Sequence, residues 1–353
     1  MSKKIKKISI KPTKNLKFTE NLLRWGKCNG RKGLPWSPSG GKHYDPYEVW
    51  VSEIMLQQTQ LKTGIKFFKK FIKIFPSIED LAKSKIENVL SAWSGLGYYS
   101  RAKNLHKSAL LICSSSKKKF PKNAQEWEKL PGVGFSTAAS ISSFVNHERV
   151  PVMDANVIRV FARQFMFQEF VGSVGLKKKI LPVATKSLPV DSYDMPIYTQ
   201  SIMDLGAIIC RPKNPKCDSC PVSISCKAFK TSNTPNYPMR RINIRREKKQ
   251  VNWLVPYTTD SVALVFLKNK KLWNGLWIPI QILSQSQMPS GASYVKKFTI
   301  PISNFTLEIT VWSVLCTNKS NYKSAKWFNK KDLLNCPVPS TVKKALSSNK
   351  FFL

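Results

Sequence analysis

Apolar side chains recur every three or four residues through most of the first 230 positions of the chain. This is the spacing of amphipathic helices, and strict alternation of apolar and polar positions does not begin until about residue 250. The helices expected from this pattern span residues 18–27, 46–60, 61–75, 78–93, 101–113, 135–145, 157–167, 182–188 and 195–209. Pro46 and Pro182 take first helical positions, where the missing backbone N–H has no intrahelical partner to lose. The first 230 residues are therefore predicted to be all-helical.

The pattern changes after residue 250. Residues 261–267 are β-branched and apolar, and residues 297–300 and 305–312 alternate with the period of a strand. Residues 230–250 between the two regions are polar and basic and contain prolines, as linkers do. We therefore expect the chain to divide as follows: a basic disordered tail at 1–17, a helical region at 18–229, a linker at 230–250 and a smaller α+β domain at 251–353.

Charge narrows the choice of partners. The chain of 353 residues has 58 Lys and Arg against 20 Asp and Glu, a formal net charge of +38, which favours a polyanion. Lys, Asn, Ile, Phe and Ser are abundant throughout, as an AT-rich coding sequence would give, so the charge serves only as support. With neither an apolar run of about 18 residues nor a secretory signal, we expect a cytoplasmic protein that does not enter a membrane.

The stretch 130–159 contains the first candidate chemistry. Residues 130–134 read Leu-Pro-Gly-Val-Gly, a tight turn whose glycines allow positive φ, and an apolar helix is expected directly after it. Backbone N–H groups at such a helix start can bind a phosphate. Asp154 follows twenty residues later, near the expected start of the next helix. Taken alone, these residues also fit a helix–turn–helix with a capping aspartate.

A second carboxylate and a group of cysteines add to the picture. Glu53 lies near the apolar side of the 46–60 helix, where it is either a paired core residue or an acid with a raised pKa. Four cysteines are bunched near the end of the helical region: Cys210, Cys217, Cys220 and Cys226. Four thiolates suit zinc or a [4Fe–4S] cluster, and the six-residue gap after the first departs from the two close pairs usual for zinc.

Together these motifs resemble the MutY family of adenine DNA glycosylases, within the helix-hairpin-helix, iron–sulfur glycosylase superfamily. The resemblance extends from about residue 18 to about residue 345 and rests on five motifs in one order. These are residues 46–59, 95–101 (Gly-Leu-Gly-Tyr-Tyr-Ser-Arg) and 130–134, Asp154, and the four cysteines. It implies a base-excision-repair enzyme that acts as a monomer on double-stranded DNA with adenine mispairs.

The resemblance also implies roles for individual residues. Glu53 would protonate the adenine and later assist water, and Asp154 would stabilise the sugar cation, since breaking an N-glycosidic bond calls for an acid and a facing carboxylate. Arg31 and Trp36 would line the pocket of the extruded base, and the cysteines at 210–226 would hold a [4Fe–4S] cluster. The residues implied to contact DNA are Gln58, Leu96, Tyr98, Leu130, Pro131, Gly132, Val133, Gly134 and Ser136.

Ser136 separates this chain from a sister family. Endonuclease III-like enzymes carry a catalytic lysine at that position, and without an amine no Schiff base forms, so we expect a monofunctional glycosylase. The C-terminal domain resembles the family's Nudix-like domain, which reads 8-oxoguanine. Its Phe-Ser-His loop corresponds here to Ile302-Ser303-Asn304, which makes Ser303 and Asn304 the candidate lesion contacts. The alternatives are an endonuclease III-like enzyme on oxidised pyrimidines and a non-catalytic iron–sulfur DNA-binding protein.

Overall fold

The computed structural model describes residues 16–38, 43–114, 119–239, 247–270, 272–302, 305–347 and 351. The chain forms two compact units, each built from two separate stretches of sequence. The first unit combines Met1–Gln58 with Leu111–Ile242, and the second combines Thr59–Leu110 with Asn243–Leu353. No helix among the described residues is long and apolar enough to cross a membrane.

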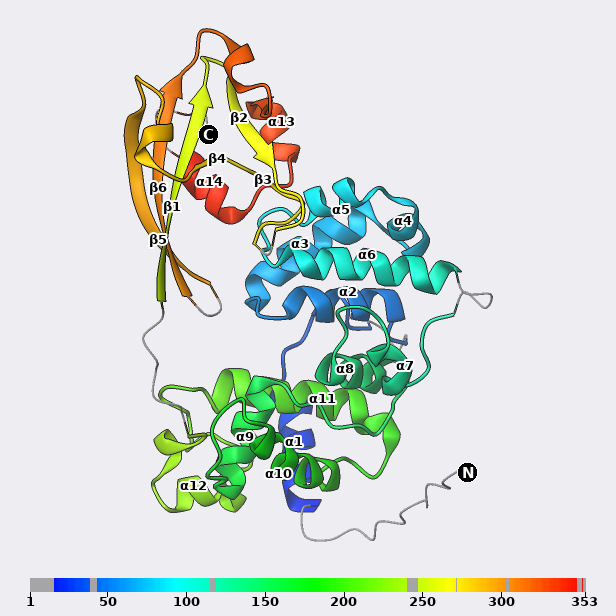
Figure 1. The fold of residues 1–353 in the computed structure, drawn as a ribbon. Helices are drawn as coiled ribbons and strands as arrows, with labels where there is room; N and C mark the ends of the chain where they lie inside the picture. The colour runs from blue at the N-terminus through cyan, green and yellow to red at the C-terminus, as the bar shows by residue number, and fades with distance from the viewer. Residues whose placement is uncertain are drawn as a thin grey trace, which may run out of the picture. The chain divides into compact units, whose positions relative to one another are not determined.

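The first unit is helical, as expected (Figure 1). Its helices are α1 (Leu16–Asn29), α2 (Pro46–Leu56), α7 (Ala124–Glu128), α8 (Phe135–Val145), α9 (Ala155–Phe165), α10 (Val174–Lys186), α11 (Met195–Asp204) and α12 (Lys227–Lys230). Several begin at side chains that accept hydrogen bonds from the first free N–H groups, such as Asp45 before α2 and Ser173 before α10. A π-helical turn, Leu205–Ile209, continues α11.

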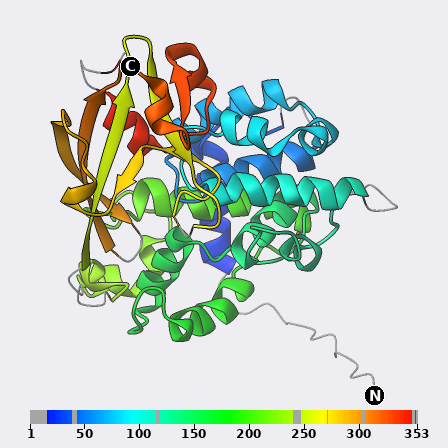
Figure 2. The ribbon, with the colours of Figure 1, turned by 45° about the horizontal axis from the view of Figure 1, so that its top comes forward.

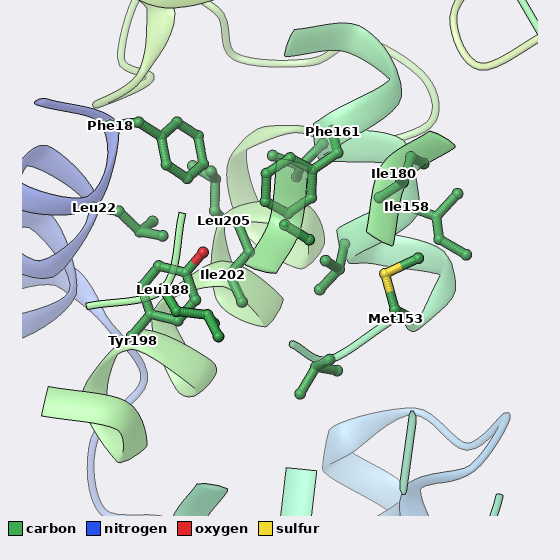
Figure 3. Close-up of a cluster of buried hydrophobic side chains, with 14 of the residues drawn as sticks. Phe18, Leu22, Met153, Ile158, Phe161, Ile180, Leu188, Tyr198, Ile202 and Leu205 are labelled. Atoms are coloured by element: carbon green, nitrogen blue, oxygen red, sulfur yellow. The ribbon is translucent and has the colours of Figure 1, made fainter. Parts of the chain in front are cut away.

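The core of this unit lies where α9 meets α1, α10 and α11 (Figure 3). Phe161 of α9 lies beside Phe18 of α1, with ring centroids 5.7 Å apart. Ile202 of α11 and Ile180 of α10 complete the apolar cluster, and both are almost fully buried. Burial of this apolar face, rather than helix propensity, is what holds α9 and the residues at its N-terminus in place.

The second unit begins with four helices: α3 (Leu61–Ile74), α4 (Ile78–Lys83), α5 (Ile86–Ala92) and α6 (Tyr99–Ser114), the last of which continues past the unit's boundary. The remainder is a mixed sheet with α13 (Lys330–Asn335) and α14 (Ser340–Leu346). The strands are β1 (Glu247–Tyr257), β2 (Ser261–Phe266), β3 (Trp277–Ile278), β4 (Ile280–Ile282), β5 (Ser293–Ile302), β6 (Phe305–Leu315) and β7 (Lys326–Asn329).

The sheet has the order β3-β2-β1-β6-β5, with β4 paired to β1 and β7 paired to β2. Strands β1 and β6 run parallel along their whole lengths, and β5 pairs with β6 as an antiparallel hairpin (Figure 2). Val255 and Val311 on one face pack with Val342 of α14, which covers that face. The smaller cluster containing Leu254 and Val314 occupies the opposite face.

Five sequence expectations need correction. The helix expected at 46–60 ends at Leu56, and α1 begins at Leu16, inside the expected disordered tail. Residues 78–93 form two helices rather than one, because Ser84 and Lys85 adopt extended backbone angles between α4 and α5. The helix expected at 182–188 begins eight residues earlier, at Val174, so Pro182 is an interior position of α10 and not its first. Strand β1 begins at Glu247, inside the expected linker, because β6 supplies a pairing edge for it.

Candidate active site

Glu53 lies on α2, a helix that is buried along most of its length. Asp45 caps this helix by accepting from the N–H groups of Tyr47 and Glu48, at 2.7 and 3.0 Å. Val49, Trp50, Val51, Ser52, Ile54 and Met55 around Glu53 are all buried. Glu53 as a whole residue is half-buried among these apolar neighbours.

This environment makes Glu53 an acid near neutral pH. The pKa of Glu53 is raised to about 7, chiefly by burial and to a smaller extent by the charge of Asp154. The Ser140 hydroxyl on α8 and the charge of Arg31 act in the opposite direction and lower the pKa. Ser140 Oγ is buried and has no hydrogen bond of standard geometry, so its stabilisation of the ionised form is partial.

Asp154 caps the N-terminus of α9, as the sequence predicted. Its Oδ1 accepts from the Val157 N–H at 2.7 Å, and its Oδ2 accepts from Asn156 Nδ2 at 3.3 Å. Burial raises the pKa of Asp154, while these hydrogen bonds and the charge of Arg159 lower it. Because its charge acts on Glu53, the two carboxyls lie within electrostatic reach of each other. The fold thus brings together two acids that are a hundred positions apart in the chain.

A chain of hydrogen bonds extends from Asp154 toward the cysteines. Asn156 donates to Asp154 and accepts from Arg159 Nη2 at 2.9 Å, and Arg159 Nε donates to the Cys210 carbonyl at 2.7 Å. Asn156 and Arg159 were not among the residues predicted to form the site. Their spacing from Asp154, two and five residues along a helix, was the available signal.

Arg31 is oriented by a partner that was also missed. Asp204 is fully buried at the end of α11, and it accepts from Arg31 Nε at 2.5 Å and from the Arg31 backbone N–H at 2.7 Å. Gln200 donates to the same carboxylate at 2.7 Å. The ion pair with Asp204 holds the Arg31 guanidinium close enough to Glu53 to lower the pKa of the Glu53 carboxyl group. Trp36, the other candidate pocket residue, is buried with 6% exposure.

The Leu130–Gly134 turn leads into α8 as expected. Gly132 has a φ of +80°, which only glycine adopts without strain, whereas Gly134 has a φ of −94° and needs no such freedom. Gly134 is the N-cap of α8 and makes no side-chain cap bond. Gln57, which was not among the predicted contacts, steadies the turn by donating to the Gly132 carbonyl and to Thr137 Oγ1 at 3.3 and 3.1 Å.

Ser136 lies in the first turn of α8, and Gln58 follows the end of α2. Ser136 Oγ accepts from the Met153 N–H at 3.1 Å and so connects α8 to the segment just before Asp154. Gln58 is exposed and has a φ of 56°, an uncommon backbone conformation for a residue with a side chain. Its side chain is presented to solvent directly after α2.

The Gly95–Tyr98 turn belongs to the second unit. Gly95, Gly97 and Tyr98 have φ values of 104°, 82° and 49°. Tyr98 is 60% exposed, while Leu96, also a predicted DNA contact, is buried with 8% exposure. The guanidinium of Arg101 lies 5.4 Å from the Tyr98 ring centroid and holds the ring from one side.

The four bunched cysteines lie close together in the first unit. The pKa of the Cys220 thiol is raised to about 12, chiefly by burial and in part by the charges of Cys210, Cys226 and Cys217. Arg163 is almost fully buried, and its Nη1 donates to Cys210 Sγ at 3.3 Å. Within the described residues no three His, Cys, Asp or Glu side chains gather tightly enough to hold one metal ion.

Comparison with known proteins gives the class first. Residues 51–174, which include Glu53 and Asp154, match the family model described as HhH-GPD superfamily base excision DNA repair protein. The structure of a thermostable thymine-DNA glycosylase superposes with a TM-score of 0.52 at 24% identity, covering 62% of this chain and 97% of that one, which supports the fold of the matched part. The fold and the site define a base-excision DNA glycosylase, joined to a C-terminal mixed-sheet domain.

Relatives that align with more of the chain narrow this class to one family. The adenine DNA glycosylase of Buchnera aphidicola subsp. Schizaphis graminum is 34% identical over 346 residues, covering 93% of this chain and 97% of the relative. The human adenine DNA glycosylase is 34% identical over 216 residues, covering 60% of this chain and 39% of the human one. The chain belongs to the adenine DNA glycosylase family, which confirms the resemblance drawn from its motifs.

Proposed function

We propose that this enzyme hydrolyses the N-glycosidic bond of adenine paired with 8-oxoguanine or guanine in double-stranded DNA and leaves an abasic site. The observation that carries the proposal is the carboxyl group of Glu53, which has a pKa of about 7 and lies within electrostatic reach of Asp154. The names of the relatives add support for adenine as the base that is removed.

The two acids divide the chemistry between them. A carboxyl group with a pKa of about 7 is about half protonated at neutral pH, so Glu53 has a proton available for the leaving base. As the bond breaks, positive charge develops on the sugar, and the Asp154 carboxylate offsets that charge. Hydrogen bonds from the Val157 N–H and from Asn156 hold Asp154 in position for this role. Once deprotonated, Glu53 is the base available to activate water.

Hydrolysis without a lyase step follows from Ser136. Its hydroxyl is already an acceptor for the Met153 N–H, and it offers no amine for a Schiff base. An endonuclease III-like reaction needs such an amine at this position. Borohydride should therefore trap no covalent adduct between this protein and DNA.

Contacts with DNA are proposed for both units. The N-terminus of α8 and the exposed Gly132 and Gly134 offer a seat for a backbone phosphate, which positions DNA without reading its sequence. Tyr98 and Gln58 are the exposed side chains proposed to fill the duplex when adenine leaves the stack. Arg31, held by Asp204, and Trp36 are proposed to shape the adenine pocket.

A [4Fe–4S] cluster is proposed at Cys210, Cys217, Cys220 and Cys226. The buried guanidinium of Arg163, whose Nη1 donates to Cys210 Sγ, fits an anionic group at the cysteines. Four cysteine thiolates are the usual ligand set of a [4Fe–4S] cluster, in which each thiolate binds a different iron. The cluster would serve as a structural anchor for the residues that bind it.

The C-terminal domain is proposed to be Nudix-like and to read the base opposite adenine. Ser303 and Asn304, the candidate lesion contacts, lie outside the described residues. The flanking Ile302 and Phe305 pair with each other at the end of the β5–β6 hairpin. We further propose that the enzyme acts as a monomer.

The test is an excision assay on a duplex with a single mispair. Purified protein is incubated with adenine opposite 8-oxoguanine, opposite guanine and opposite thymine, and the DNA is then cleaved with alkali. We expect strand breaks at adenine in the first two duplexes and few in the third. Absence of breaks in all three, from protein with the visible absorbance of an intact cluster, would overturn the proposal.

A further inference from the structure

Tyr99 is a buried tyrosine next to the exposed Tyr98, and it touches two parts of the second unit. Its side chain is 8% exposed, and its hydroxyl donates to the Val338 carbonyl, just before α14, at 2.6 Å. Burial raises the pKa of the Tyr99 hydroxyl, and hydrogen bonds with the Ser94 side chain and the Gly95 backbone lower it. One hydroxyl group thus meets both the turn that carries Tyr98 and the C-terminal domain.

The seam on which this bond lies is only partly packed. A cavity of about 740 Å³ lies beside it, lined by Leu90, Lys103 and His106 on the helices and by Trp277, Phe328 and Cys336 on the C-terminal domain. An open cavity removes apolar contacts that would otherwise hold the two surfaces in register. Individual hydrogen bonds must therefore contribute more to holding these two surfaces in register.

Few such bonds cross the seam among the described residues. Besides Tyr99, Lys103 Nζ donates to the Asn274 carbonyl at 2.7 Å, and Ser94 Oγ reaches the Val338 carbonyl at 3.5 Å. The Ser94 contact is long for a hydroxyl donor, which makes Tyr99 the principal partner of Val338. The Val338 segment is itself anchored to the sheet, since the Trp277 N–H donates to the Pro337 carbonyl at 3.1 Å.

We propose that Tyr99 is a positioning residue that couples the C-terminal domain to Tyr98, so that the base read opposite adenine sets the rate at which adenine leaves the stack. The inference rests on the proposed function, because it takes Tyr98 as the intercalating side chain. It adds that specificity for 8-oxoguanine depends on the hydroxyl group of the buried Tyr99.

The test is Tyr99→Phe, which keeps the ring and removes only the hydroxyl. Single-turnover rates of adenine excision are measured opposite 8-oxoguanine and opposite guanine, and their ratio is compared with that of wild type. We expect the ratio to fall roughly five- to tenfold, as loss of one buried hydrogen bond allows. Tyr193→Phe is the matched control, because Tyr193 is 74% exposed and its variant should leave the ratio unchanged.

A second variant and a second readout keep the outcome clear. Lys103→Met removes the bond from Lys103 to the Asn274 carbonyl and should also lower the ratio. Hydrogen exchange on the free protein should rise both at the Gly95–Tyr98 turn and at α14 in Tyr99→Phe, a result that needs no substrate.

An unchanged ratio, or equal losses opposite both bases, would refute the coupling while leaving adenine excision intact. Unchanged hydrogen exchange at α14 in Tyr99→Phe would refute it as well. A wild type without adenine excision would instead refute the proposed function, and hydrogen exchange would still report on the seam.

Discussion

The two candidate acids of the first unit and the candidate intercalating side chain of the second are packed in different ways. In the first unit, Glu53 and Asp154 lie on helices packed against buried neighbours, and Asp154 is held by two hydrogen bonds at a helix start. In the second unit, Tyr98 stands on a short turn with three residues at positive φ, next to a seam that contains a cavity. Chemistry demands atoms fixed to a fraction of an ångström, whereas a side chain that enters and leaves a duplex needs freedom to move.

The contrast predicts how substitutions divide. Changes at the two acids of the first unit should alter the chemical step and leave DNA binding in place. Changes in the second should alter base extrusion and discrimination between opposite bases. The substitutions below test this division, beginning with the largest expected effect.

Asp154→Asn should reduce single-turnover excision by about 10³-fold, because the amide cannot offset the charge of the sugar cation. Mispair affinity should stay within about threefold of wild type, measured by fluorescence anisotropy, since the amide oxygen can still cap α9. The control is Asp191→Asn, which replaces another capping aspartate away from the two acids. Normal turnover in Asp154→Asn would remove this residue from the mechanism.

Glu53→Gln should reduce excision by about 10²-fold or more, because the leaving base loses its proton donor. The wild-type rate should be level at acid pH and fall as pH rises through about 7, where Glu53 gives up its proton. The residual rate of Glu53→Gln should not show this fall with rising pH. A variant profile that keeps the same inflection would assign it to another group.

Tyr98→Ala should slow excision by about tenfold, the scale of one lost stacking contact. Because the ring is 60% exposed, the melting temperature should barely change. Fluorescence of 2-aminopurine placed beside the mispair should report less unstacking than with wild type. A loss of melting temperature instead would mean that the ring supports the fold.

The smallest expected effect is on stability, again at Glu53. The folded-state pKa of about 7 lies above the ordinary value of 4.5, so the folded protein holds more protons than the unfolded chain between these values. Stability therefore falls as pH rises through this window. Glu53→Gln escapes that loss and should exceed wild type by about 1–3 kcal/mol at alkaline pH, with the difference fading toward pH 5. Denaturant melts at both pH values measure it, and a variant that is less stable at alkaline pH would contradict the assignment.

Local signals anticipated much of the architecture. The helix at 135–145 matches α8, and the turn before it and the cap at Asp154 are in their expected places. These features depend on neighbours along the chain: turn residues, capping side chains and apolar spacing. The errors at 182–188 and at the start of β1 concern elements whose limits are set by distant partners, namely the core around Ile180 and the edge of β6.

By itself, the sequence determined which residue types are available for the chemistry: two carboxylates, a glycine turn, four bunched cysteines and a serine where a sister family has lysine. Tertiary structure decided what those groups can do. It gave Glu53 its raised pKa, paired Arg31 with Asp204, buried Leu96 and exposed Tyr98, and placed the Tyr99 hydroxyl against Val338. The physical reason is that pKa, orientation and exposure depend on atoms brought close through space, and the linear order of residues does not specify those distances.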